Sequence, residues 1–469
     1  MTDSTRPSCL LITFQAPRMP GGGGEVRSYN LVRTAAEVFD LTVINIGGMS
    51  GDGCVPAEIK AICRRVIEPP DFPSAATEPG AAGGRMSSWL RLLSAVMLPW
   101  VDHFRPYLRL LLQHGASTAP GLAGSLVRAA DAIWARCSGV MPITCFMFDA
   151  AWRRIQPQAL HLAAAEKFDL VWVEHTLAWP FAEQLLALPA LRHVPVLCSG
   201  HNVEHSVCER LAEVESQPRQ RQLYRRQAIV MRRMELRAWR RSRLILQCSA
   251  ADAQLTRRLL PDAAVEVLGN GVDGRYFQSD NSVSRSELPL IVFTAGFGYQ
   301  PNAEAVTWFL ASVLPLIRRA IPEVGFLFAG SDAQRLARGL QTASEVSLDG
   351  VEWISDPPDI RPAFGRGLVY VVPLLCGGGS RLKILEAMSM RVPVVSTSVG
   401  AEGVPYEDGK HLLLADGAEA FAAAVVRLLQ DAQLRQRLTE QAAEFVREAW
   451  DWSTLRTQLR GVLQKEFCQ

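Results

Sequence analysis

Short apolar runs alternate with longer segments of helical period through most of this sequence. This alternation is typical of parallel β-sheets whose strands are joined by crossover helices. In the N-terminal half the runs predict strands at residues 9–14, 41–46, 170–173, 194–198 and 244–248. In the C-terminal half they predict strands at residues 290–294, 325–328, 368–372, 392–396 and 412–414. The pattern therefore predicts an α/β protein with two doubly wound sheets.

The chain is long enough for two domains, because 469 residues exceed what one hydrophobic core usually serves. Between the two sets of predicted strands, residues 272–288 have no apolar period and are rich in turn residues. We place the interdomain linker there. The expected domains are residues 1–280 and 281–469, and we expect the last helix to pack back on the N-terminal domain.

The most informative stretch is residues 373–388, which reads as a strand end, a glycine turn and a helix. The turn contains three consecutive glycines: Gly377, Gly378 and Gly379. Glycine tolerates positive φ and lets a backbone approach a ligand closely. Ser380 can cap the helix that follows, which leaves first-turn N–H groups for an anion in the turn.

Two cations, Arg381 and Lys383, stand in the first turn of this predicted helix. Positive charge there is unfavourable for the helix itself, and an anionic ligand such as a phosphate would resolve the conflict. At about 100° per residue, Lys383 and Glu386 share one face. The apolar residues share the opposite face: Leu382, Leu385 and Met388. The alternative is an ordinary surface ion pair between Lys383 and Glu386 beside a structural turn.

Ligands of doubly wound sheets bind at the carboxyl ends of strands. After the first predicted strand comes a glycine turn that includes Gly22, Gly23 and Gly24, and after the first strand of the second half comes Gly296. These turns suit close approach of a diphosphate or a sugar. The first turn lacks the GxGxxG spacing and a following acid, which disfavours a nicotinamide-dinucleotide site.

A carboxylate and two imidazoles follow neighbouring predicted strands. Glu174 and His175 come after one strand, and His201 comes shortly after the next. Such groups can transfer protons or bind sugar hydroxyls. A histidine at a strand end is also often a satisfied structural residue, and both interpretations stay open here.

A predicted long helix over residues 219–243 carries ten arginines and one acid, Glu235. It could face anionic lipid or simply be a solvated basic surface. The formal net charge of the whole chain is only +2, which argues against a protein built for nucleic-acid binding.

The ten cysteines are scattered without CxxC spacing, so neither a zinc site nor a disulfide framework is predicted. We expect reduced thiols and a cytoplasmic location. The N-terminus does not have the pattern of a signal peptide, and no segment has 18 uninterrupted apolar residues.

Taken together, these motifs resemble the retaining family 4 glycosyltransferases, which have the GT-B architecture of two Rossmann-like domains. The resemblance is specific in the C-terminal half, through residues 270–273, Pro301-Asn302, residues 377–388 and residues 400–403. It is looser in the N-terminal half, through the first glycine turn and the strand-end Glu174 and His175.

The resemblance implies roles for individual residues. Glu386 is similar to the family glutamate that accepts hydrogen bonds from the nucleotide ribose. Arg381 and Lys383 resemble cations that neutralise the donor diphosphate. The sequence departs from the commonest family pattern at Gly378, where a first glutamate usually stands, and a subset with a GGGSRLK-like loop shares this departure.

The resemblance implies transfer of a hexosyl group from a nucleoside-diphosphate sugar to an acceptor hydroxyl with retention and without a metal or other cofactor. Among Glu174, His175 and His201, it does not decide which acts at the sugar. The implied acceptor is a glycan, a lipid-linked molecule or another hydroxyl compound in polysaccharide or glycoconjugate synthesis, with peripheral contact to an anionic membrane and no nucleic acid. The alternatives are a GT-B-fold epimerase or phosphorylase, a non-catalytic nucleotide-sugar-binding protein and, more remotely, a dehydrogenase.

Overall fold

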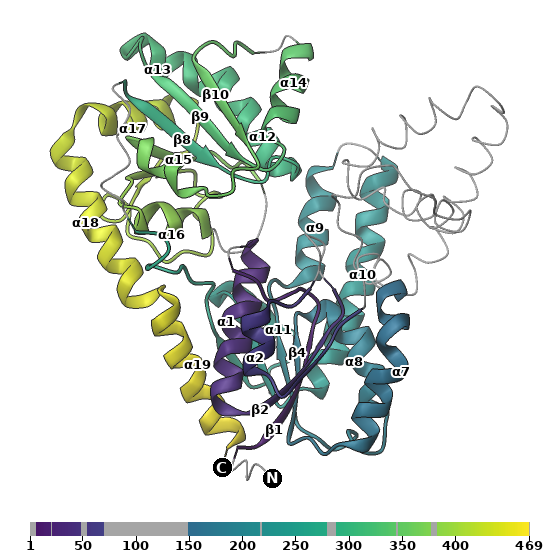
Figure 1. Ribbon diagram of the computed structural model, residues 1–469. Helices are drawn as coiled ribbons and strands as arrows, with labels where there is room; N and C mark the ends of the chain where they lie inside the picture. The colour runs from purple at the N-terminus through teal and green to yellow at the C-terminus, as the bar shows by residue number, and fades with distance from the viewer. Residues whose placement is uncertain are drawn as a thin grey trace, which may run out of the picture. The chain divides into compact units, whose positions relative to one another are not determined.

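A computed structural model of the chain divides into two compact units (Figure 1). It describes residues 6–19, 21–47, 54–69, 149–215, 218–278, 288–343, 346–376 and 382–468. Unit 1 consists of Met1–Gln247, Asp252–Val267 and Arg460–Gln469. Unit 2 consists of Cys248–Ala251 and Leu268–Leu459.

Unit 1 is built on a parallel sheet of seven described strands in the order β3-β2-β1-β4-β5-β6-β7. Their bounds are β1 Ser8–Thr13, β2 Asp40–Asn45, β3 Arg65–Ile67, β4 Leu170–Glu174, β5 Val196–Ser199, β6 Leu244–Gln247 and β7 Val265–Val267. The central strands are apolar along their length and buried on both faces, as a parallel sheet covered by helices requires.

Helices cover both faces of this sheet, with α1 and α2 on one side of it and α7 and α8 on the other (Figure 1). The described helices of unit 1 are α1 Gly23–Val38, α2 Ala57–Ile62, α7 Asp149–Ala165, η1 Thr176–Ala178, α8 Trp179–Leu186, α9 Glu204–Val214, α10 Pro218–Arg241 and most of α11 Ala250–Leu259. Buried aromatic residues of α7, α8 and α10 fill the core on one face: Trp152, Phe181 and Trp239.

Unit 2 has a second parallel sheet, with the described strands in the order β10-β9-β8-β11-β12-β13. Their bounds are β8 Leu290–Thr294, β9 Gly325–Gly330, β10 Val351–Ser355, β11 Val369–Val372, β12 Val394–Ser396 and β13 Leu413–Leu414. The helices are α12 Gln300–Trp308, η2 Phe309–Val313, α13 Leu314–Ala320, α14 Ala333–Ala343, α15 Arg361–Arg366, α16 Leu382–Ser389, α17 Ala418–Gln430 and α18 Ala432–Ala449. A cluster of phenylalanines lies in its core: Phe293, Phe309, Phe326 and Phe328.

The structure confirms all ten strands predicted from the apolar runs, within about two residues at each end. Three further strands, β3, β7 and β10, were not predicted. All three lie at an edge of their sheet. Two of them have only three residues, and β10 contains the polar residues Glu352 and Ser355 and has no buried residue. Edge strands of this kind lack the continuous apolar run that marks a central strand.

The segment that we read as the start of the linker is attached to unit 2. The Gly274 N–H donates to Asp451 at 2.9 Å, and the Phe277 carbonyl accepts from Ser389 at 2.8 Å. Residues 279–287 lie outside the described part of the chain. The last helix, α19 (Trp452–Phe467), is continuous and contributes to both units. Its residues up to Leu459 belong to unit 2, and those from Arg460 onwards belong to unit 1, where Arg460 pairs with Glu37 of α1.

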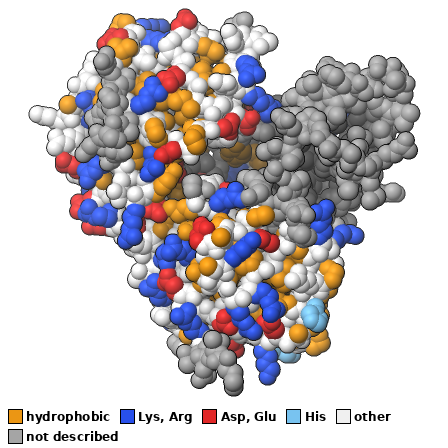
Figure 2. Space-filling view, viewed as in Figure 1, with side chains coloured by type: hydrophobic (Ala, Val, Ile, Leu, Met, Phe, Trp, Pro, Cys, Tyr) orange, Lys and Arg blue, Asp and Glu red, His pale blue; other side chains and the backbone are white. Residues whose placement is uncertain are grey.

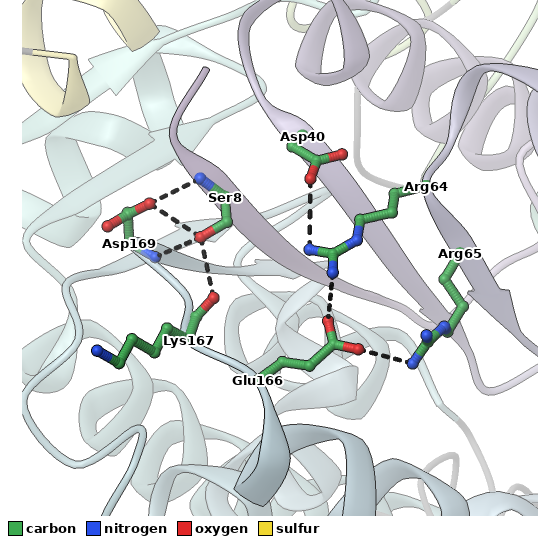
Figure 3. A network of polar contacts seen from close by, with 7 residues as sticks. All are labelled: Ser8, Asp40, Arg64, Arg65, Glu166, Lys167 and Asp169. Carbon is green, nitrogen blue, oxygen red and sulfur yellow. Dashed lines mark hydrogen bonds and ion pairs between the residues drawn. The ribbon is translucent and has the colours of Figure 1, made fainter. Parts of the chain in front are cut away.

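A polar network joins the amino ends of four strands in unit 1 (Figure 3). The Asp169 carboxylate accepts from the Ser8 N–H at 2.7 Å and from the Ser8 hydroxyl at 2.9 Å. Glu166 pairs with Arg64 at 3.4 Å and with Arg65 at 2.8 Å. This edge of the sheet is the one opposite the carboxyl ends, where ligands of such folds bind. The network is therefore a structural feature.

On the face shown in Figure 2, basic side chains are interspersed with acidic ones. This distribution agrees with the net charge of +2.

Replacing Asp169 by alanine should lower the free energy of unfolding by about 1 kcal/mol, because the Ser8 backbone and hydroxyl lose a charged acceptor. Urea denaturation measures the change. Asp262→Ala is the matched control, since Asp262 is an exposed acid shortly before β7. The control should stay within about 0.5 kcal/mol of the parent. A loss of nucleotide binding in Asp169→Ala would contradict a purely structural role.

Candidate active site

Three strand ends meet around Glu174 at the carboxyl edge of the unit 1 sheet. Glu174 is the last residue of β4 and lies in register with Thr13 of β1 and Ser199 of β5. Its fully buried carboxylate accepts from the Thr13 hydroxyl at 3.1 Å and contacts His201 Nε2 at 2.5 Å. The structure thus brings two of the predicted residues, Glu174 and His201, into direct contact.

Glu174 is ionised in spite of its burial. Burial raises its pKa, but the charge and hydrogen bond of His201 and the charge of Arg27 outweigh that effect. Together they hold the pKa of Glu174 below its ordinary value of 4.5. The contact with His201 is therefore a hydrogen bond that Nε2 donates to a carboxylate. Arg27, on α1, is itself fully buried.

His175 is held in an unusual backbone conformation, with φ at +68°. Such values are uncommon for residues with a side chain and often occur at functional sites. Its Nδ1 accepts from the Leu177 N–H at 3.2 Å, and its ring lies 4.4 Å from that of His201. Burial, His201 and Arg27 lower the pKa of His175 well below 6.5. His175 is thus a neutral imidazole with its proton on Nε2.

A second carboxyl group lies beside that proton. Glu204, the first residue of α9, has Oε1 at 3.8 Å from His175 Nε2. Burial, together with the carboxyl group of Glu235, raises the pKa of Glu204 to about 8. Glu204 therefore carries its proton at neutral pH. Sequence reasoning did not select it, although it lies three residues after His201.

Glu235 of α10 holds the beginning of α9 in place. Its carboxylate accepts from the N–H groups of Glu204 at 2.7 Å and His205 at 3.2 Å, and it contacts His205 Nδ1 at 2.6 Å. A carboxylate near a helix N-terminus is stabilising because it satisfies N–H groups that have no partner within the helix. Sequence reasoning missed this role too. The feature that could have revealed it is that Glu235 is the single acid among ten arginines in residues 219–243.

The glycine turn of unit 1 leads into α1. The Gly22 N–H donates to the carboxylate of Glu25 at 2.8 Å, so the helix supplies its own anion at this position. A Cβ on Gly24 would lie 2.0 Å from Oε1 of Gln15, which explains why a residue without a side chain stands there. Gly23 is the exposed first residue of the helix.

In unit 2, the turn after β8 is organised by Asn302. Gly296 is exposed, and its carbonyl accepts from Asn302 Nδ2 at 2.9 Å. Asn302 lies in the first turn of α12 with 8% of its surface exposed. Its other amide atom, Oδ1, accepts from Lys383 Nζ at 3.0 Å. The structure therefore connects two predicted site residues, Gly296 and Lys383, through a third that sequence reasoning gave no role.

Lys383 and Glu386 share the half-buried face of α16, as the helical period predicted. The Lys383 ammonium lies 4.7 Å from the centre of the Phe293 ring, a cation–π distance. Burial raises the pKa of Glu386 to about 7, although the Lys383 charge opposes this shift. On the other face of the helix, Leu385 and Met388 are fully buried and Leu382 is half-buried.

Five further predicted residues of the donor loop lie outside the described residues: Gly377, Gly378, Gly379, Ser380 and Arg381. Within the described ranges, no group of three or more His, Cys, Asp or Glu side chains could hold a metal ion. The same part of the chain contains no helix that is both long and apolar enough to span a bilayer.

Two family profiles match the chain. The profile described as Glycosyltransferase Family 4 matches residues 128–275, and the one described as Glycosyl transferases group 1 matches residues 288–431.

Among curated proteins, an uncharacterized 44.6 kDa protein in the cps region of Klebsiella pneumoniae is 26% identical over 165 residues, which are 34% of this chain and 42% of that protein. An alpha-D-kanosaminyltransferase of Streptomyces kanamyceticus is 26% identical over 245 residues, or 47% of this chain and 60% of that protein. The matches thus span less than two thirds of either relative.

Among solved structures, Anabaena Alr3699/HepE in complex with UDP and glucose has a TM-score of 0.58 and 13% identity. The likeness covers 98% of this chain and 100% of that one, and at this identity it shows the fold alone.

Both matching profiles describe glycosyltransferases, and together they span more than half of the sequence. The structural likeness agrees with the two Rossmann-like domains expected from the apolar pattern. The chain therefore has the GT-B fold of glycosyltransferases, with residues 128–275 similar to family 4 and residues 288–431 similar to group 1.

Proposed function

We propose that the protein transfers a hexosyl group from a nucleoside-diphosphate sugar to an acceptor hydroxyl, with retention of anomeric configuration and without a bound metal. The observation that carries this proposal is the pair on α16. A lysine held by Asn302 and a glutamate with a pKa of about 7 share one half-buried face at the carboxyl edge of a parallel sheet.

On the donor side, Lys383 neutralises the diphosphate as it becomes the leaving group. Arg381 and the loop from Gly377 to Ser380 act with it, through a guanidinium and backbone N–H groups. Glu386 accepts hydrogen bonds from the ribose hydroxyls in its ionised form. The sequence of this loop supports our proposal that the protein belongs to the glycosyltransferase subset with a GGGSRLK-like loop.

On the sugar side, His175 is the best donor of a hydrogen bond. The Glu174 carboxylate already accepts from Thr13 and His201 and is fully buried, so it serves to orient His201. His175 keeps its Nε2 proton and carries no charge. A neutral N–H suits a sugar hydroxyl oxygen, and it stabilises an oxocarbenium-like transition state without adding positive charge beside it.

The names of two similar proteins support a nucleotide sugar as donor and a glycosylated compound as product. One is named for transfer of a kanosaminyl group, and another was solved with UDP and glucose. We infer a nucleotide sugar as donor and a role in polysaccharide or glycoconjugate synthesis. Incubation of the donor without an acceptor distinguishes the alternatives, because an epimerase would convert it and a non-catalytic protein would bind it unchanged.

Ligand binding tests the proposal directly. A panel of UDP- and GDP-sugars is added to the protein, and the thermal unfolding midpoint is measured for each. A donor at 100 times its Kd should stabilise the protein by about 2.7 kcal/mol.

Lys383→Ala should lower turnover by roughly 10²-fold or more, because the leaving group loses a cation.

Lys410→Ala is the matched control, because Lys410 forms an exposed i,i+3 pair with Glu407 at 2.7 Å in the same unit. The proposal fails if Lys383→Ala and Glu386→Ala leave turnover at the level of this control.

The pKa of Glu386 predicts how donor binding depends on pH. Only the carboxylate can accept from both ribose hydroxyls, and burial raises its pKa to about 7. Below this value a proton must be released on binding. The affinity for the donor should therefore fall as the pH drops from 8 to 6 and level off above 8. Calorimetry measures it, and Glu386→Gln should remove the dependence. An unchanged pH profile in that variant would assign the titration to another group.

We further propose that α10 contacts anionic lipid at the cytoplasmic face of the cell membrane, where a lipid-linked acceptor would lie. Three exposed arginines and an isoleucine with 54% exposure fall within about a quarter of the helix circumference. These residues are Arg225, Ile229, Arg232 and Arg240. A basic stripe with an apolar side chain is suited to a negatively charged bilayer surface.

Vesicle flotation tests this contact. The protein should float with vesicles that contain anionic phospholipid and not with neutral ones. At about 1 kcal/mol per arginine, Arg225→Gln/Arg232→Gln should bind roughly thirtyfold more weakly. Arg338→Gln/Arg437→Gln removes the same charge from exposed positions of unit 2. Equal loss in both double variants would mean that net charge alone, and not the stripe, drives binding.

A further inference from the structure

Asn302 uses both ends of its side-chain amide, and each end meets a residue of the proposed donor site. Nδ2 donates to the Gly296 carbonyl at 2.9 Å, and Oδ1 accepts from Lys383 Nζ at 3.0 Å. Asn302 is buried, with 8% of its surface exposed, so water does not replace either partner at low cost.

The partners of the amide fix its orientation. If it were rotated by 180°, Nδ2 would face the Lys383 ammonium and Oδ1 would face the Gly296 carbonyl oxygen. Both contacts would be repulsive, because donor would meet donor and acceptor would meet acceptor. The Gly296 carbonyl therefore keeps the Asn302 oxygen directed at Lys383.

The Lys383 ammonium has three N–H donors. One is directed at Asn302, and the Phe293 ring lies 4.7 Å from Nζ. Both of these contacts are with groups that carry no net charge, and the hydrogen bond to Asn302 restricts the position of the ammonium. An acidic residue in place of Asn302 would instead add a negative charge beside the place proposed for the diphosphate.

We propose that Asn302 is a positioning residue that holds the Lys383 ammonium in place for the donor diphosphate and ties it to the turn at Gly296. The inference rests on the proposed function, because it takes Lys383 as the diphosphate ligand. A long, flexible lysine loses side-chain entropy when it is fixed for a ligand. The hydrogen bond to Asn302 already restricts the lysine side chain before the donor binds, so less entropy is lost on binding. This is preorganisation.

A double-mutant cycle tests the inference. Calorimetry measures the affinity for UDP, and for GDP in parallel, in the parent protein, Asn302→Ala, Lys383→Ala and the double variant. Asn302→Ala should weaken binding of the diphosphate roughly tenfold in the parent and less than about twofold when Lys383 is already absent. Independent losses that multiply in the double variant would overturn the proposal.

Two further measurements separate positioning from a merely structural role. Asn302→Ala should leave the affinity for the free nucleoside, uridine or guanosine, unchanged, because the nucleoside has no phosphate. Asn302→Asp keeps an acceptor for Lys383 but adds a negative charge there, so it too should weaken the diphosphate and spare the nucleoside. If either variant weakened nucleoside and diphosphate equally, Asn302 would serve only to hold the loop.

The control and the order of measurement keep the two proposals apart. Thr307→Ala removes a side-chain hydrogen bond to the Ala303 carbonyl on the same helix and should leave the affinity for UDP and GDP unchanged. If Lys383→Ala bound both diphosphates as well as the parent, the donor site itself would be wrongly assigned. If Lys383→Ala lost affinity for the diphosphates and Asn302→Ala did not, only the proposed role of Asn302 would be wrong.

Discussion

Parallel strand pairing is the constraint on which the rest of this structure depends. Every described pairing within the two sheets runs in parallel, so each pair of consecutive strands within a sheet needs a crossover connection, usually a helix, that returns the chain to the same starting edge. All the turns that lead out of strands then gather at the opposite edge of each sheet. Residues as distant in sequence as Thr13, Glu174 and His201 meet there, and so do Asn302 and Lys383. At the amino edge of the unit 1 sheet, the hydrogen bond from Ser8 to Asp169 connects neighbouring strands.

The sequence alone predicts those strands in which every residue is buried or nearly so. Strands such as β1 and β8 are covered on both faces, so their apolar runs are unbroken and easily recognised. The edge strands β3, β7 and β10 have one neighbour each, and partial exposure removes that pattern. Helix α10 was predictable for a different reason: its arginines leave a narrow apolar stripe with a clear period.

The candidate site was predictable where a motif is local and not where it depends on packing. The relation of Lys383 to Glu386 follows from helical spacing alone. Glu204, Glu235 and Asn302 acquire their partners from other elements, and no spacing rule in a single sequence reports such contacts. The charge states also come from packing. One glutamate, Glu174, is ionised in a fully buried position, while Glu204 remains protonated with a pKa of about 8.

The backbone of His175 has a consequence for how the two units respond to salt. His175 has a positive φ, and its Nδ1 accepts from the Leu177 N–H, so a main-chain group sets the tautomer and no carboxylate partner is needed. The imidazole is then a donor without charge, and dissolved ions do not screen its hydrogen bonds. Under the proposed function, the Lys383 ammonium attracts the diphosphate by charge and is open to screening. Added salt would then weaken the binding of a diphosphate in unit 2 and leave the hydrogen bonds of His175 in unit 1 unaffected.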